Sequence, residues 1–165
     1  FIYQQGWIPR KRARPEDHRF PEMRSVRGTY DEAELVVEGQ PQPELTMMGY
    51  DVGSDAIYTM NEQYKILVAK KIAGTAAKLV IADQINQKQK GLGTLAYVLM
   101  QAADQADLRQ WSTMPESFQV ARMSLPPGIH KVRIEGVGSY GRVSVWEGEL
   151  EVRAGKKTFF THRTF

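Results

Sequence analysis

The stretch DLRQWSTMPESFQVARMSLPPG, residues 107–128, marks the place where the hydrophobic period of this chain changes. Upstream, between residues 61 and 105, apolar residues recur in steps of three and four, which predicts helices. Downstream of Trp111 they recur in steps of two, which predicts strands. Pro115 prevents a helix from resuming, and the closing Pro-Pro-Gly predicts a turn. The chain is therefore expected to be an α+β protein.

Two helices are predicted ahead of this joint, as a helical hairpin at about 61–106 inserted into a β protein. The first is amphipathic and runs from Asn61 to about Lys90, with apolar residues at Tyr64, Leu67, Val68, Ile72, Ala76, Leu79, Val80 and Ile85. The second runs from about Thr94 to Gln105, with an inward face expected at Leu95, Val98, Leu99 and Ala102. Small residues make one stretch of the first helix thin enough for close approach of another element: Ala69, Ala73, Gly74, Ala76 and Ala77.

Short strands are predicted on both sides of the hairpin. Ahead of it, alternation through Ala33, Leu35 and Val37 favours one strand, and residues 43–60 could supply another one or two. In the β-rich part at 117–165 we expect strands at 118–124, 129–135, 142–147, 149–153 and 156–162. Phe118 and Val120 are expected to begin a buried face. This pattern is typical of an antiparallel, β-sandwich-like domain, so residues 29–165 are expected to form a single α+β domain.

Residues 1–28 are rich in Pro and Arg and show no sustained period, which predicts an irregular basic arm or linker. Its apolar residues, Phe1, Ile2, Trp7 and Phe20, could anchor it to a neighbour. Because the first residue is Phe and not Met, we expect a processed or partial chain.

Composition excludes several classes of protein and site. The 165 residues contain no Cys, so disulfides, thiol nucleophiles and Cys-ligated zinc are excluded. No apolar run is long enough to span a bilayer. The net charge is +3, but residues 1–30 carry seven Lys or Arg against three acids, and residues 151–165 carry four against one. Basic ends around a slightly acidic middle suit a solvated arm, an anionic polymer or a partner's acidic face.

No catalytic or cofactor motif in the sequence has the neighbouring residues that its function requires. Gly136, Gly138 and Gly141 spell G-x-G-x-x-G, but the residues that follow alternate like a strand, whereas a dinucleotide site needs a helix there. The histidines, His18, His130 and His162, are too scattered to predict a metal site. Asp104 and Asp107 are paired carboxylates that would motivate a hydrolase, but they share a helix face only if the second helix continues that far, and a polar helix end explains them without catalysis. We therefore expect no cofactor, no metal and no enzyme activity.

Two clusters are candidates for contact with a partner. The run RKRAR at 10–14 has the length of a basic patch that binds polyanions. It lacks the interleaved aromatic residues of nucleic-acid-binding modules, so we do not expect this chain to bind nucleic acid. Arg109 and Arg122 are charges beside apolar residues of the opening stretch. The candidate contact residues are Trp7, Arg10, Lys11, Arg12, Arg14, Arg109, Trp111 and Arg122.

The same stretch resembles the C-terminal region of the tetratricopeptide-containing envelope lipoproteins of Gram-negative bacteria. The similarity spans roughly residues 55–165 and rests on Ala106-Asp107-Leu108-Arg109, Trp111, Met114-Pro115, Gln119-Val120-Ala121-Arg122 and Leu125 to Gly128. It implies a periplasmic domain held at the outer membrane through an upstream lipidated Cys. Some members are encoded near lipoproteins that activate peptidoglycan synthases. The family provides no catalytic residues, and these residues contain neither tetratricopeptide repeats nor an anchor Cys.

These observations predict a non-catalytic subunit that binds protein partners in an oligomeric or hetero-complex of the envelope, in secretion, motility or cell-wall synthesis. The alternative is binding of peptidoglycan or another anionic envelope polymer through the basic ends. An unrecognised hydrolase is the third hypothesis.

Overall fold

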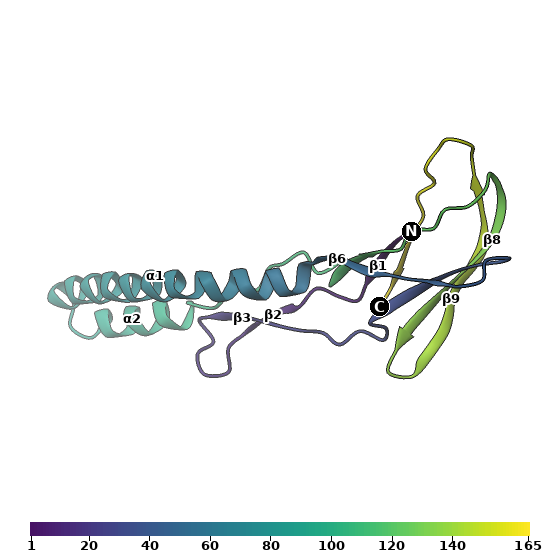
Figure 1. Ribbon diagram of the computed structural model, residues 1–165. Helices are drawn as coiled ribbons and strands as arrows, with labels where there is room; N and C mark the ends of the chain where they lie inside the picture. The colour runs from purple at the N-terminus through teal and green to yellow at the C-terminus, as the bar shows by residue number, and fades with distance from the viewer. The chain divides into compact units, whose positions relative to one another are not determined.

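The computed structural model describes residues 1–165 as a mixed α+β chain with two helices and ten strands (Figure 1). The helices are α1 (Val52–Lys88) and α2 (Leu92–Ala102). The strands are β1 (Ile2–Gln5), β2 (Arg10–Ala13), β3 (Pro21–Arg24), β4 (Glu32–Val37), β5 (Glu44–Leu45), β6 (Met47–Asp51), β7 (Ser117–Val120), β8 (Gly128–Gly138), β9 (Gly141–Val152) and β10 (Thr161–Thr164).

The chain divides into two compact units, and each contains segments that are distant in sequence. Unit 1 comprises residues 1–9, 25–56 and 111–165, and unit 2 comprises residues 10–24 and 57–110. Unit 1 holds the two larger sheets, whereas unit 2 holds most of α1, all of α2 and the β2–β3 hairpin. The boundary expected after residue 28 does not coincide with a boundary of either unit.

Unit 1 contains two four-stranded sheets. The first has the order β10-β1-β7-β6 and is antiparallel except for the parallel pair of β1 and β10. The second has the order β5-β4-β8-β9 and is antiparallel throughout. Its long hairpin joins β8 to β9, which is one strand of 12 residues where the sequence predicted two. The predicted strand through Ala33, Leu35 and Val37 is confirmed as β4.

One hydrophobic cluster draws its residues from both sheets of unit 1. Its members are Tyr3 of β1, Ala33, Leu35 and Val37 of β4, Ala121 after β7, and Val132 and Ile134 of β8. The members from β4 and β8 alternate along their strands, as expected when one face of a strand is buried. Burial of this face fixes the register of the β4–β8 pair, because a shift by one residue would turn the buried set toward solvent.

The buried face of β7 is polar, and the prediction that Phe118 and Val120 begin it is wrong. Ser117 and Gln119 are the buried residues, whereas Val120 is exposed. The reason is a hydrogen-bond network: the Gln119 amide donates to the Asp31 carbonyl at 2.7 Å, and the Ser117 hydroxyl donates to Gln5 Oε1 at 3.1 Å. Buried polar groups of this kind are stable only when they are paired, and these are.

Residues 1–28 contain three strands, so the expectation of an irregular segment there is wrong. β1 lies inside the first sheet of unit 1, with β7 on one side and β10 on the other. β2 and β3 form a separate two-stranded sheet in unit 2. β1 is stabilised by pairing with strands more than 100 residues away. The residues around it therefore show no periodic pattern that would predict a strand.

The predicted helical hairpin is confirmed, although α1 begins earlier than Asn61. The Asp51 carboxylate accepts hydrogen bonds from the Ser54 backbone N–H at 2.8 Å and from the Ser54 hydroxyl at 2.6 Å. A carboxylate in this position satisfies N–H groups that have no partner in the first helical turn, so it starts the helix at Val52.

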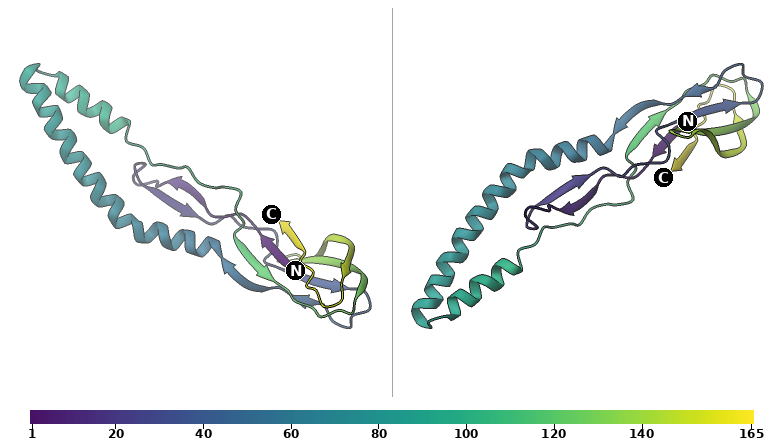
Figure 2. Two further views of the ribbon diagram at one scale, coloured as in Figure 1. Left: turned by 90° about the horizontal axis from the view of Figure 1, so that it is seen from above. Right: turned by 90° about the horizontal axis from the view of Figure 1, so that it is seen from below.

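α2 runs back beside α1 in both views of Figure 2. The contact is close at Gly93, where a Cβ atom would collide with the backbone oxygen of Ala82 and lie 2.8 Å from the side chain of Asn86. Asn86 also accepts hydrogen bonds from the N–H groups of Gly91 at 3.0 Å and Gly93 at 3.2 Å. A residue of α1 thereby caps the N-terminus of α2.

Candidate functional site

The side chains that the sequence singled out in residues 1–14 lie in both units. Trp7 is half-buried in unit 1, where its ring stacks on Phe165 at 4.3 Å and the Arg163 guanidinium lies 5.0 Å above it. In unit 2 the Arg14 guanidinium lies 4.1 Å above the ring of Tyr64. Trp7 and Arg14 therefore have partners within the chain.

The β2–β3 hairpin presents an arginine pair. Arg10 lies directly opposite Arg24 in the antiparallel register, and Arg12 lies opposite Glu22. Arg24 forms an ion pair with Glu22, and Arg10 and Arg12 are exposed. Like charges at directly opposite positions destabilise a strand pair, so this arrangement is suited to an anion that neutralises them. Lys11, on the other face, is half-buried, and its backbone N–H donates to the Gln110 side chain.

Arg109, Trp111 and Arg122 are all exposed, and each has different contacts. Arg109 belongs to unit 2 and makes a two-point ion pair with Asp107 at 2.9 and 2.8 Å. Trp111 is 71% exposed in unit 1, where its indole N–H donates to the Thr113 hydroxyl at 2.6 Å. The Arg122 side chain has no hydrogen bond or ion pair within the chain.

α2 has a bare apolar face. Leu95, Val98 and Leu99 lie on one side of the helix and are 54%, 55% and 61% exposed. The helical period of the sequence predicts this stripe, but the expectation that it faces inward is wrong. α2 packs instead through its opposite side, which carries buried Gly93 and half-buried Tyr97 and Met100. Gly93 in its first turn was the signal that could have identified the packed side, because a Cβ atom there would collide with the Ala82 backbone oxygen of α1.

α1 has a second bare stripe, with apolar residues in alternating steps of three and four. We name the α1 stripe as Ile66, Ala69, Ala73, Ala76 and Val80; all five are exposed, Ile66 to 56% and Val80 to 58%. This spacing is the one by which helices pack side by side in coiled coils. The small residues of α1 that were expected to let another element approach are therefore exposed, and no element of this chain packs on them.

The inner side of α1 carries two lysines that hold a carboxylate. Lys71 and Lys78 both form ion pairs with Asp104, Lys78 at 3.1 Å. The hydrogen bond from Lys71 lowers the pKa of Asp104 below its ordinary value although partial burial acts in the opposite direction. The hydrogen bonds from Arg109 likewise lower the pKa of Asp107. Both directions favour the carboxylate form of these two groups, whereas a general acid must carry a proton.

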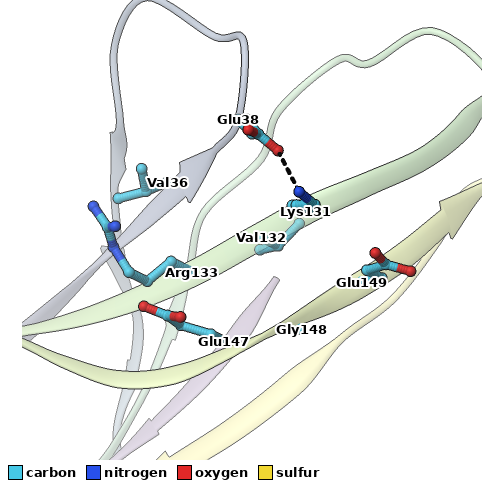
Figure 3. A pocket seen from close by; sticks show the side chains of 8 residues that line it. All are labelled: Val36, Glu38, Lys131, Val132, Arg133, Glu147, Gly148 and Glu149. Atoms are coloured by element: carbon cyan, nitrogen blue, oxygen red, sulfur yellow. Dashed lines mark ion pairs between the residues drawn. The ribbon is translucent and has the colours of Figure 1, made fainter.

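The outer face of the second sheet of unit 1 bears a shallow groove of about 490 Å³ (Figure 3). Five charged side chains line it, and one ion pair joins two of them, Lys131 and Glu38 at 3.5 Å; Arg133 pairs with Glu135 beside the groove at 2.8 Å. Glu147 accepts a hydrogen bond from Ser144 at 3.2 Å. Such a face, made of exposed charged side chains, is typical of the solvated side of a sheet.

The glycines of the G-x-G-x-x-G sequence have packing and turn roles. A Cβ atom at Gly136 would lie 2.7 Å from the ring of Tyr30, and one at Gly138 would lie 2.5 Å from the Thr29 carbonyl oxygen. Gly141 has φ of +95°, a conformation that favours glycine, at the turn from β8 to β9. The residues after the motif form a strand, as the sequence predicted.

Comparison of the chain with protein families, with curated proteins and with solved structures finds no match. Neither α1 nor α2 combines the length and the apolar composition that a helix needs to cross a bilayer. No group of three or more His, Asp or Glu side chains is arranged to hold a metal ion.

Proposed function

We propose that this chain is a non-catalytic subunit that binds a protein partner through the bare face of α2. The observation that carries the proposal is the exposure of Leu95, Val98 and Leu99 on one helix face. An apolar stripe at positions i, i+3 and i+4 is the side that a surface helix normally turns toward a core. Full burial of each such side chain contributes about 1.5–3 kcal/mol, so a partner that covers the stripe gains substantial affinity.

The α1 stripe supports the same function with a second surface. Its three alanines allow a partner helix to approach closely, and its end residues, Ile66 and Val80, supply most of the area. Exposed apolar residues are unremarkable when they stand singly, but ordered stripes on two helices are typical of interaction surfaces.

We place the partner in an envelope assembly of a Gram-negative bacterium, in the periplasm and associated with the outer membrane. This part of the proposal rests on the resemblance of residues 106–128 to the envelope lipoproteins, and it covers secretion, motility and cell-wall machinery. The two sheets of unit 1, which share one hydrophobic cluster, are then the layers of a sandwich-like support.

The test is native purification of the tagged chain from envelope extracts, followed by mass spectrometry of intact complexes. We expect a stoichiometric complex with the original chain, and its loss when Leu95, Val98 and Leu99 are all replaced by Asp. The control is Ile129→Asp, because Ile129 is an apolar residue of unit 1 that is even more exposed, at 70%. Retention of the complex by the triple variant, with an unchanged circular dichroism spectrum, would exclude the α2 face as the interface.

An alternative function is binding of peptidoglycan or another anionic envelope polymer, and the Arg10–Arg24 pair favours it. This hairpin takes the role that the sequence assigned to a basic arm. Retention on purified sacculi at low salt, lost at raised salt and in the R10Q/R24Q variant, is the expected result, since salt screens exposed charges. Absence of retention at low salt would remove this alternative.

A further inference from the structure

Unit 1 has an apolar groove that the proposed partner surfaces do not use. It has a volume of about 480 Å³ and lies beside the first residues of β1. One wall is formed by residues 120–125, at and beyond the end of β7, and the other by residues 156–160, which precede β10. Thirteen of its eighteen lining residues are apolar, and its volume is within the range of about 300–1,000 Å³ that is typical of small-molecule sites.

Ordered aromatic and aliphatic side chains line the inner part of the groove. Phe1 stacks on Phe160 with ring centroids 5.6 Å apart, and the ring of Trp146, which does not itself line the groove, lies 4.4 Å from that of Phe160. Leu35 and Val132 reach the groove from the hydrophobic cluster of unit 1. The apolar wall is therefore continuous with the core and largely formed before any ligand enters.

All the charged residues of the groove are basic. They are Arg122 on one wall and Lys156 and Lys157 on the other, and no Asp or Glu lines the groove. These three side chains are exposed, and none makes a hydrogen bond or ion pair within the chain. Three unpaired cations around an apolar groove are complementary to a ligand that joins an anionic head to an apolar tail.

We propose that this groove binds a long-chain fatty acid as its carboxylate. The alkyl chain lies along the apolar wall, and the carboxylate lies between Arg122 and the two lysines. A guanidinium group beside ammonium groups suits a carboxylate, because Arg can offer two parallel N–H donors and Lys adds positive charge. The modest volume favours a single alkyl chain.

An extended acidic peptide is the rival occupant, because the N–H groups of residues 122–125 have no backbone partner. The fatty acid is favoured because a peptide would bring its own N–H and C=O groups to the apolar wall, where most of them would be unsatisfied. The volume of the groove also disfavours a phospholipid with two acyl chains, so the rivals tested are a single-chain lysophosphatidate and an acidic peptide.

The test is calorimetric titration of the 165-residue protein with myristate held below its critical micelle concentration. We expect saturable 1:1 binding of myristate and at least about tenfold weaker binding of myristyl alcohol, since the alcohol lacks the charge. If myristyl alcohol binds equally well, the basic residues contribute nothing to binding and the ligand is held by apolar contacts alone, which would overturn the proposal. Binding of a single-chain lysophosphatidate, or of the peptide (Glu-Val)₄, without binding of myristate would overturn it as well.

Variants locate the site. R122Q/K156Q/K157Q should weaken myristate by about tenfold or more, whereas K131Q/R133Q/R153Q, which removes three other exposed cations of unit 1, should leave it unchanged. Ser124→Trp should block the groove from the wall side, because Ser124 is an exposed lining residue. Each variant is checked by its thermal midpoint. Equal losses in the two triple variants would show a general charge effect and contradict the assignment.

Discussion

The Thr46 hydroxyl donates a hydrogen bond of 2.6 Å to Oε1 of Gln119 in the interior of unit 1. Both residues are buried, and the same hydroxyl oxygen accepts the N–H of Ala33 at 2.9 Å. The pair therefore links β7 of one sheet to β4 of the other through Thr46, which lies between β5 and β6. A polar connection inside a hydrophobic domain fixes one register, because every alternative leaves these groups unpaired.

Gln119→Leu should destabilise unit 1 by about 2–4 kcal/mol. The change leaves the Thr46 hydroxyl without its acceptor and the Asp31 carbonyl without its donor, and each unsatisfied buried group costs about 1–3 kcal/mol. The free energy of unfolding is measured by urea denaturation. Gln4→Leu is the control, because Gln4 is half-buried in β1 and its side chain has no hydrogen bond within the chain; a similar loss in both variants would contradict the network.

Glu116→Gln should stabilise the protein at pH 7 and not at pH 4. Burial raises the pKa of Glu116, against the effect of its hydrogen bond with Gln5, and nearby Asp51 and Asp31 raise it further. The folded state therefore disfavours the carboxylate, a penalty that is absent below the ordinary pKa of 4.5, grows between that value and the raised pKa, and is complete above it. Denaturation midpoints of the variant and the original chain, compared at the two pH values, check this sign. A larger difference at pH 4 would contradict it.

The local patterns of the sequence predict those helices and strands whose residue spacing is set by their own geometry. Alternation through Ala33, Leu35 and Val37 predicts β4, because the same face is buried along the whole strand. Steps of three and four predict α1 and α2, since those steps follow from the helix geometry alone. The Gly-rich stretch around residue 141 predicts a turn, and Gly141 adopts there a positive φ that favours glycine.

What the sequence could not predict depends on partners that are distant in the chain. Ser117 and Gln119 are buried because their hydrogen-bond partners come from residues 5, 31 and 46, and nothing next to them announces this. α2 turns Leu95, Val98 and Leu99 outward because Gly93 decides which side faces α1. The apolar spacing on α2 was therefore predictable from the sequence, but the exposure of these three side chains to solvent was not.

Asp104→Asn should destabilise unit 2 by about 1–2 kcal/mol at pH 7. The change removes the charge that holds Lys71 and Lys78, whose side chains are largely covered. Because the pKa of Asp104 is lowered in the folded state, its contribution is present above the ordinary value of 3.8 and is lost as pH falls through the lower pKa. The difference between variant and original chain, measured by urea denaturation, should therefore shrink in acid.

Asp107→Asn is the matched control for this pair of lysines. It removes a carboxylate of the same type three residues away, but its partner Arg109 is fully in solvent. Exposed ion pairs contribute little, so the denaturation midpoint should not change. A loss as large as that of D104N would show that charge in this segment matters generally and that the two lysines have no special role.

Gly93→Ala and Gly74→Ala should have opposite effects on thermal stability. Both residues lie in helices, where Ala is favoured over Gly by about 0.5–1 kcal/mol. Nothing lies within 4 Å of a Cβ atom at Gly74, so G74A should raise the midpoint of thermal unfolding. At Gly93 the new methyl group meets the Ala82 backbone oxygen, which cannot move without parting the helices, so G93A should lower the midpoint by an overpacking cost of about 1–3 kcal/mol. Hydrogen exchange should report the loss in α2 first, and faster exchange in β4 with α2 still protected would contradict the packing of α2 through this glycine.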